Sequence, residues 1–128
     1  MSRKYLEDII PKEEILGYHN EMEGRHTRWL KQEEIYGFND IETWCLDVAF
    51  AQLIYERLMM YKEVGGSIVD LNYHTFKMDD KEYTELELID MMLEHCKYVI
   101  QNDDLDEQLN HMDEVWKIMG VMHSTLWW

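Results

Sequence analysis

Residues 84–126, TELELIDMMLEHCKYVIQNDDLDEQLNHMDEVWKIMGVMHSTL, decide the fold class. Apolar residues recur three and four positions apart in both halves of this stretch, which is the spacing of one buried face of a helix. The first half carries Leu86, Ile89, Leu93, Cys96 and Ile100, and the second half carries Leu105, Leu109, Met112, Trp116, Met119, His123 and Leu126. We therefore expect two helices that pack as an antiparallel pair across the short turn at Asn102-Asp103.

Three positions carry a helix-start signature, in which a capping residue is followed three places later by glutamate. They are Asn39-Asp-Ile-Glu42, Thr84-Glu-Leu-Glu87 and Asp104-Leu-Asp-Glu107. The short side chain accepts a hydrogen bond from an unpaired N–H, and the glutamate returns to the cap. The first signature predicts a helix from Asn39 to about Val64 that stops at Gly65-Gly66, because glycine readily adopts the left-handed cap.

The remaining segments give weaker signals. An earlier helix is predicted from near Pro11 past Trp29, with Ile15, Met22 and Trp29 on one face and Gly17 and Gly24 weakening it. Between residues 67 and 78 the pattern changes, because apolar and polar residues alternate at positions 69–73. This alternation predicts an extended segment, which either lies over the bundle as an ordered loop or pairs with another chain. We favour the loop. The chain is thus expected to be a single all-α domain (residues 1–128), an up-and-down bundle of about four helices.

Composition narrows the function. The chain has 128 residues, and Lys+Arg 12 against Asp+Glu 27 gives a net charge of −15. Such a surface repels phosphate backbones, so direct nucleic-acid binding is not expected. The start, MSRKYLEDIIP, lacks the apolar core of a signal peptide, and no apolar run is long enough to span a membrane. Two cysteines, Cys45 and Cys96, suit a reducing compartment, so we expect a cytoplasmic protein.

One helical region resembles a known group of proteins. The residues that carry the resemblance are Tyr36-Gly37-Phe38-Asn39-Asp40-Ile41-Glu42-Thr43-Trp44-Cys45-Leu46-Asp47, Tyr55-Glu56-Arg57-Leu58 and Tyr61. This pattern, Gly-Phe-(Asn/Ser)-Asp…Trp…Leu-Asp…Arg-Leu over about residues 36–64, resembles small uncharacterised helical proteins encoded by bacteriophages. The resemblance implies a phage or prophage origin and no particular activity. The chain departs from many relatives in its N-terminus of mixed charge and in having Gly65-Gly66 where they have Pro-Gly.

A carboxylate in the second half of this region falls on an apolar arc. At 100° per residue Asp47 is level with Trp44, Ala51, Ile54 and Leu58. A carboxylate there needs a partner or a proton. It makes a structural hydrogen bond, or it lines a functional pocket or pairs with a histidine, unless the phase of the helix differs from the one assumed. On either reading Asp47→Ala is expected to destabilise the protein more than the surface change Glu56→Ala.

The candidates for catalysis and metal binding are few. Glu23-Gly-Arg-His26 has the spacing used in di-iron bundles, but that architecture needs two such motifs, and the chain has only a reversed His111-Met-Asp-Glu114 besides. Glu23, His26 and His111 are therefore weak metal candidates, and no metal or other cofactor is expected. Nucleophilic catalysis by either cysteine has no support in the sequence pattern, and there is no phosphate-binding loop, so no enzyme is expected.

Acidic runs and exposed aromatic residues are the better candidates for a binding surface. Asp103, Asp104, Asp106 and Glu107 form the densest acidic run, with Asp79-Asp80 and Asp113-Glu114 elsewhere. Such runs imitate a phosphate array or simply form a solvated face. Trp127 and Trp128 close the chain, and we expect them to cover the open end of the bundle or to dock onto a second subunit.

These observations predict a non-enzymatic, phage-type binding protein that inhibits or sequesters a host factor with a basic surface. Such a protein would act as a nucleic-acid mimic or an anti-defence protein. An alternative is an oligomeric sponge for a nucleotide-like ligand, which would use Arg25, Arg28, Lys31 and Arg57 with Trp29, Tyr55 and Tyr61. A ligand pocket would draw on Asp47, Trp44, Arg57, Tyr61, Arg25 and Arg28. A metal-dependent enzyme with a histidine and carboxylate site is a third possibility.

Overall fold

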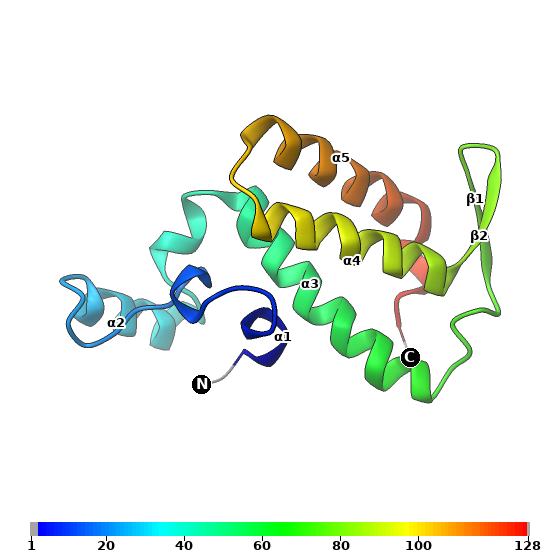
Figure 1. Cartoon of the computed structure of the whole chain (residues 1–128). Coiled ribbons are helices and arrows are strands. Elements are labelled where there is room, and N and C mark those ends of the chain that lie inside the picture. Colours follow the sequence, from blue (N-terminus) through cyan, green and yellow to red (C-terminus); the bar gives the residue numbers. More distant parts are fainter. Residues whose placement is uncertain (1–2, 128) are drawn as a thin grey trace.

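The computed structural model describes residues 3–127, and this part of the chain is mostly helical, as predicted. Its three long helices are α3 (Leu46–Val64), α4 (Glu85–Gln101) and α5 (Leu105–Met122). Figure 1 shows them side by side, with α5 running back along α4 after the turn at residues 102–104. The antiparallel pair predicted for residues 84–126 is therefore present.

The shorter elements lie around these three helices. They are α1 (Lys4–Glu7), α2 (His26–Tyr36), a hairpin of β1 (Thr75–Met78) and β2 (Lys81–Thr84), and 3-10 turns at Lys12–Glu14, Asp40–Thr43, Gly65–Ser67 and His123–Thr125. In Figure 1, α2 lies apart from the long helices at one end of the molecule, and the hairpin lies at the other end. Three helices rather than four thus share the main core.

The core fills the space between α3, α4 and α5. α4 contributes Leu88, Ile89, Met92, Leu93, Cys96 and Val99, and α3 contributes Ala51, Ile54, Tyr55 and Leu58. Three of the five residues predicted for the inner face of α4 (Ile89, Leu93 and Cys96) are buried, and the other two are half-buried. Burial raises the pKa of the Cys96 thiol to about 12, so this cysteine behaves as a small apolar core residue.

The prediction assigned the wrong side of α5 to the core, because the helix is rotated about its axis relative to the expected orientation. Leu105, Leu109 and Trp116 are 65%, 43% and 42% exposed, and His123 is exposed as well. The buried residues of α5 are Met112, Val115, Ile118 and Met122. α5 carries two apolar stripes that share Met112, and the stripe with Val115, Ile118 and Met122 faces the core. Of the other stripe, Leu105, Leu109 and Trp116 lie on the outside of the molecule, whereas Met119 and Leu126 are half-buried against the core.

The helix-start signatures open helices at two of the three positions. At Thr84 the hydroxyl accepts the N–H of Glu87 at 3.2 Å, and the N–H of Thr84 donates to Glu87 Oε1 at 2.9 Å. At Asp104 the carboxylate accepts the N–H of Glu107 at 3.0 Å. The N–H of Asn39 donates to Glu42 Oε2 at 2.9 Å, but only a 3-10 turn follows.

The predicted helix from Asn39 to Val64 is therefore two pieces. Cys45 adopts φ −136° and ψ 88°, which breaks the helical path, so α3 begins at Leu46. α3 does end at Val64, but the predicted left-handed cap is absent. Gly65 has φ −63° and continues into the 3-10 turn Gly65–Ser67.

The predicted helix from Pro11 past Trp29 does not form. After the turn Lys12–Glu14 the chain is irregular until α2 begins at His26. Gly17 has φ +92°, which ends any helical path there. Of the three residues predicted to share one face of this helix, Ile15 and Trp29 are buried, but Met22 is 92% exposed.

The extended segment is shorter and later than predicted. Residues 69–73 form no strand, whereas residues 75–78 pair antiparallel with residues 81–84 of the same chain. The segment is therefore part of a hairpin, and it is neither an ordered loop throughout nor a strand that pairs with another chain. Asp79 and Asp80 make the two-residue turn with φ +52° and +63°. Turns of this kind usually carry Asn-Gly or Asp-Gly, and Asp-Asp gave no such signal.

Candidate interaction surface

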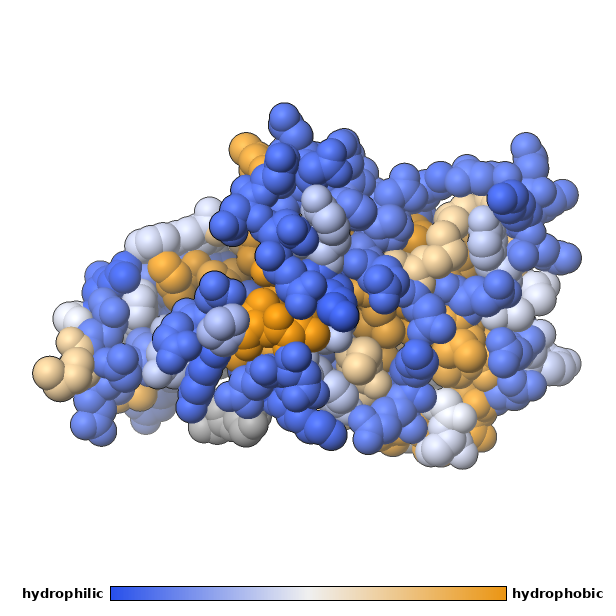
Figure 2. Space-filling view, in the orientation of Figure 1, coloured by the Kyte–Doolittle hydropathy of each residue, from blue (hydrophilic) through white to orange (hydrophobic). Residues whose placement is uncertain are grey.

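The misassigned stripe of α5 adjoins exposed apolar residues of α3. We call the combined surface the outer apolar face; its members are Leu46, Phe50, Leu53 and Met60 of α3 and Leu105, Leu109 and Trp116 of α5. Phe50 and Trp116 join the two helices in an edge-to-face contact, with ring centroids 5.8 Å apart. All seven side chains are at least 40% exposed. Figure 2 shows one side of the molecule, where hydrophilic residues (blue) cover most of the surface and apolar residues (orange) are visible between them.

The predicted acidic interface lies at the start of α5, next to this face. Asp103, Asp104, Asp106 and Glu107 are all exposed. Asp104 caps the helix, and Asp106 and Glu107 lie in its first turn, where the positive end of the helix dipole favours carboxylates. Part of this acidity thus stabilises the helix. Asp106 and Asp113 lie three residues before and four residues after Leu109, so both border the outer apolar face.

The C-terminal tail lies against the end of α3. The hydroxyl of Tyr61 is 3.0 Å from Glu85 Oε1, 3.3 Å from the carbonyl of Thr125 and 3.4 Å from that of Trp127. Burial and the hydrogen bond to Glu85 raise the pKa of Tyr61 to about 12. The Trp127 side chain is 76% exposed, so it does not close the end of the core. Trp128 lies outside the described residues.

Of the cations proposed for a nucleotide-like ligand, Arg25 and Arg28 lie near Trp29 and are already in contact with other side chains. The guanidinium of Arg25 lies 4.4 Å from the ring of Trp29 and 5.2 Å from that of Trp44. Arg28 pairs with Asp40 at 3.0 Å. The other members of the group lie elsewhere: Lys31 is exposed on α2, Arg57 is exposed on α3, Tyr55 is buried in the core and Tyr61 contacts Glu85.

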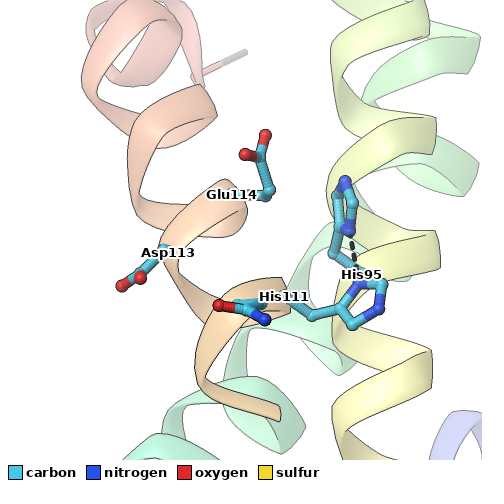
Figure 3. A pocket seen from close by; sticks show the side chains of 5 residues that line it. His95, His111, Asp113 and Glu114 are labelled. Carbon is cyan, nitrogen blue, oxygen red and sulfur yellow. Dashed lines mark hydrogen bonds between the residues drawn. The ribbon is translucent and has the colours of Figure 1, made fainter. Parts of the chain in front are cut away.

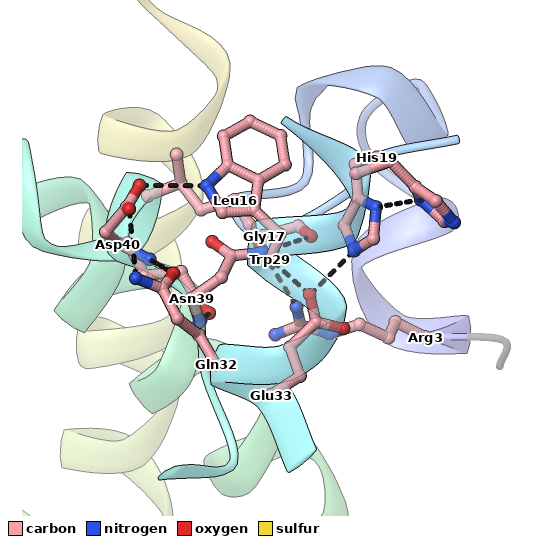
Figure 4. Close-up of polar contacts among 11 residues, drawn as sticks. Arg3, Leu16, Gly17, His19, Trp29, Gln32, Glu33, Asn39 and Asp40 are labelled. Atoms are coloured by element: carbon pink, nitrogen blue, oxygen red, sulfur yellow. Dashed lines mark hydrogen bonds and ion pairs between the residues drawn. The ribbon is translucent and has the colours of Figure 1, made fainter. Parts of the chain in front are cut away.

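A polar network fixes α2 to the segments beside it, as Figure 4 shows. Asp40 accepts hydrogen bonds from the Trp29 indole (2.8 Å) and from Gln32 (3.1 Å), and these bonds hold the pKa of Asp40 below its usual value. Asn39 is 1% exposed and donates to the carbonyl of Gly17 and to Glu33, both at 2.9 Å. Asn39 and Asp40 therefore act here as structural anchors.

Asp47 is not the buried carboxylate that the sequence predicted. It lies half-buried in the first turn of α3, and no hydrogen bond or ion pair joins it to another residue within residues 3–127. Trp44, predicted to share its arc, is 65% exposed. Ala51, Ile54 and Leu58 of the predicted arc are buried, but α3 begins only at Leu46, which leaves Asp47 at the open end of the helix.

Glu56, predicted to be a plain surface residue, has the stronger contacts. Arg3 donates to Glu56 Oε2 at 2.6 Å and to Oε1 at 3.1 Å, and it donates to the carbonyl of Leu16 at 3.2 Å. The Glu56 side chain is only 17% exposed. This contact ties both the start of the chain and the segment around Leu16 to α3.

The predicted stability ranking of Asp47 and Glu56 is therefore reversed. Glu56→Ala is expected to lower the free energy of unfolding by about 1 kcal/mol, because a two-point, half-buried ion pair lies at the upper end of the range for surface pairs. Asp47→Ala is expected to cost less than that, since it loses only a helix-dipole contact. Chemical denaturation of both variants, with a double-mutant cycle to Arg3→Ala, checks this. A larger loss in Asp47→Ala would contradict it.

The histidines form two pairs, neither of which the sequence predicted. His19 and His26 face each other with 2.7 Å between their Nδ1 atoms, and His19 Nε2 lies 2.7 Å from Glu33 Oε2. His95 of α4 and His111 of α5 face each other with 2.8 Å between their Nδ1 atoms (Figure 3). Within residues 3–127, no three His, Cys, Asp or Glu side chains are placed to hold a metal ion together. Of the weak metal candidates, His26 and His111 thus pair with histidines, and Glu23 pairs with Arg25.

A signal for the second pair was present in the sequence. His95 and His111 each lie eight residues from Asp103, in the turn of the antiparallel pair, so the turn brings them opposite each other. No comparable symmetry relates His19 to His26, because the segment between them is irregular.

Comparisons with known proteins add no relative. No family model, no curated protein and no solved structure matches the chain. Among the described residues, no helix combines the length and the apolar character needed to cross a membrane.

Proposed function

We propose that this chain is a non-enzymatic binding protein of phage type, which inhibits or sequesters a host protein in the host cytoplasm. In this proposal the outer apolar face is the docking surface. The observation that carries it is the contact between Phe50 of α3 and Trp116 of α5. Both helices belong to the core, yet these two residues are 40% and 42% exposed. Exposed aromatic side chains on a fixed scaffold are typical of the residues that dominate binding energy at protein interfaces.

The charge of the chain supports a partner with a basic surface. Asp106 and Asp113 border the outer apolar face, and the net charge is −15. A basic partner is attracted to such a molecule from a distance, and apolar contact then holds the complex. A complex of this kind is expected to form more slowly as the salt concentration rises.

The test is quantitative affinity capture of proteins from a bacterial host lysate with the wild-type chain, Trp116→Ser and Trp44→Ser. Trp44 is a matched control because it is also an exposed tryptophan but lies outside the outer apolar face. A host protein that binds the wild type and Trp44→Ser, and is lost with Trp116→Ser, supports the proposal. Equal capture by all three proteins would contradict it.

A second copy of the chain is the competing occupant of this face. Sedimentation equilibrium of the same three proteins separates the two cases. A monomer for all three agrees with a host partner. A wild-type dimer that dissociates only in Trp116→Ser would show that the face serves self-association instead.

A further inference from the structure

The histidine pair between α4 and α5 has the geometry of two ligands as well as that of a hydrogen bond. His95 and His111 come from two helices of the core, and their Nδ1 atoms are 2.8 Å apart. Tyr98 stacks on the His111 ring, with centroids 4.0 Å apart and planes 26° from parallel. The ring of His111 is therefore held in place by an aromatic contact that does not involve its nitrogens.

The distance between the two nitrogens distinguishes among coordination geometries. Bonds from a metal ion to imidazole nitrogen are about 2.0 Å long, so two such bonds at a right angle place the nitrogens about 2.8 Å apart. Tetrahedral bonds would place them about 3.3 Å apart. The observed separation of 2.8 Å equals the distance between adjacent nitrogen ligands of a square or octahedral ion.

The surroundings of the pair suit a hydrated cation. A hollow of about 320 Å³ adjoins it, lined by His95, Asn110, His111, Asp113 and Glu114. Figure 3 shows Glu114 and both rings at this hollow. Glu107 Oε2 lies 4.0 Å from His111 Nε2, on the side of the ring away from His95. At this distance Glu107 does not hold the second nitrogen of His111 by a hydrogen bond.

We propose that His95 and His111 are two adjacent ligands of a divalent transition-metal ion, Cu²⁺ or Ni²⁺. In this proposal the chain supplies two imidazole ligands, and water molecules occupy the remaining coordination positions. Asp113 and Glu114 accept hydrogen bonds from that water across the hollow. Both ions favour square or octahedral arrangements of nitrogen and oxygen, and imidazole suits both. Because the ligands come from two helices, the ion would crosslink α4 to α5.

The pair of His19 and His26 is the matched control within the same chain. Its nitrogens are 2.7 Å apart, but the His19 side chain is only 6% exposed, and its second nitrogen is held by Glu33 at 2.7 Å. Glu33 in turn accepts a hydrogen bond from the buried Asn39. This pair belongs to the network that fixes α2, and we assign no ion to it.

The experiment is titration of the full chain with CuCl₂ and, separately, NiCl₂, followed by calorimetry and by the melting temperature. We expect one ion per chain and a rise of several degrees in Tm, because a ligand that binds only the folded state stabilises it. His95→Gln and His111→Gln are each expected to weaken binding at least about tenfold. His19→Gln and the exposed His123→Gln are expected to bind as the wild type does.

Electron paramagnetic resonance of the wild-type chain with one equivalent of Cu²⁺ gives a readout that does not depend on any variant folding. Two coordinated imidazole nitrogens are expected in the spectrum. The proposal is overturned if Tm does not change, if the spectrum shows no imidazole nitrogen, or if His19→Gln removes binding while His95→Gln keeps it. Circular dichroism of each variant confirms that a lost signal is not lost folding.

Discussion

Replacing Ile118 with alanine is expected to lower the free energy of unfolding by about 3 kcal/mol. Ile118 is fully buried in α5, on the face that packs into the core with Val115 and Met122. The substitution removes three carbon atoms from a close-packed interior, and the surrounding side chains cannot fill the space completely. Urea denaturation monitored by circular dichroism measures the loss.

Leu109→Ala is the matched control, because it removes a similar aliphatic group from the same helix. Leu109 is 43% exposed, so the expected loss is below about 1 kcal/mol. The sequence pattern alone predicts the opposite order, since Leu109 belongs to the predicted inner stripe and Ile118 does not. A larger loss in Leu109→Ala would mean that α5 is rotated and that the outer apolar face does not exist.

The sequence predicted the structure best where all local signals indicated the same element. In residues 84–101 the capping residue Thr84, its partner Glu87 and an apolar stripe all indicate the same helix, and α4 forms as expected, with Leu88, Met92 and Val99 buried beside the predicted stripe. α5 has an equally clear start at Asp104 but two apolar stripes. Periodicity alone does not determine which stripe faces the core, because that depends on the residues of α3 and α4 opposite.

The N-terminal third shows why the remaining elements were not predictable. Between Pro11 and Thr43 the chain is held by long-range polar contacts, such as Arg3 to the carbonyl of Leu16 and Asn39 to the carbonyl of Gly17. Such contacts leave no periodic trace in the sequence. The same is true of the outer apolar face, whose residues read as core until the packing of α3 and α5 is known.

The second large effect is expected from Tyr61→Phe, which should lower the free energy of unfolding by about 2 kcal/mol near pH 8. The Tyr61 hydroxyl lies 3.0 Å from the carboxyl group of Glu85, which is 3% exposed. It carries one proton and therefore donates to one acceptor at a time, and Glu85 is the nearest of the three around it. Phenylalanine keeps the ring but leaves a buried carboxyl group without this donor.

The pH dependence distinguishes this explanation from a simple loss of packing. The pKa of Tyr61 is raised to about 12 in the folded chain, whereas an unfolded tyrosine has the ordinary value of 10.0. Between these two values the unfolded state has released the proton and the folded state still holds it, so the contribution of Tyr61 to stability falls as the pH rises. The gap between the wild type and Tyr61→Phe should therefore be smaller at pH 11 than at pH 8. Tyr73→Phe, at a side chain 77% exposed, should show no gap at either pH. If the gap for Tyr61→Phe were the same at both pH values, the Tyr61 hydroxyl would titrate alike in the folded and unfolded chain, and neither its burial nor its hydrogen bond to Glu85 would be the cause of the gap.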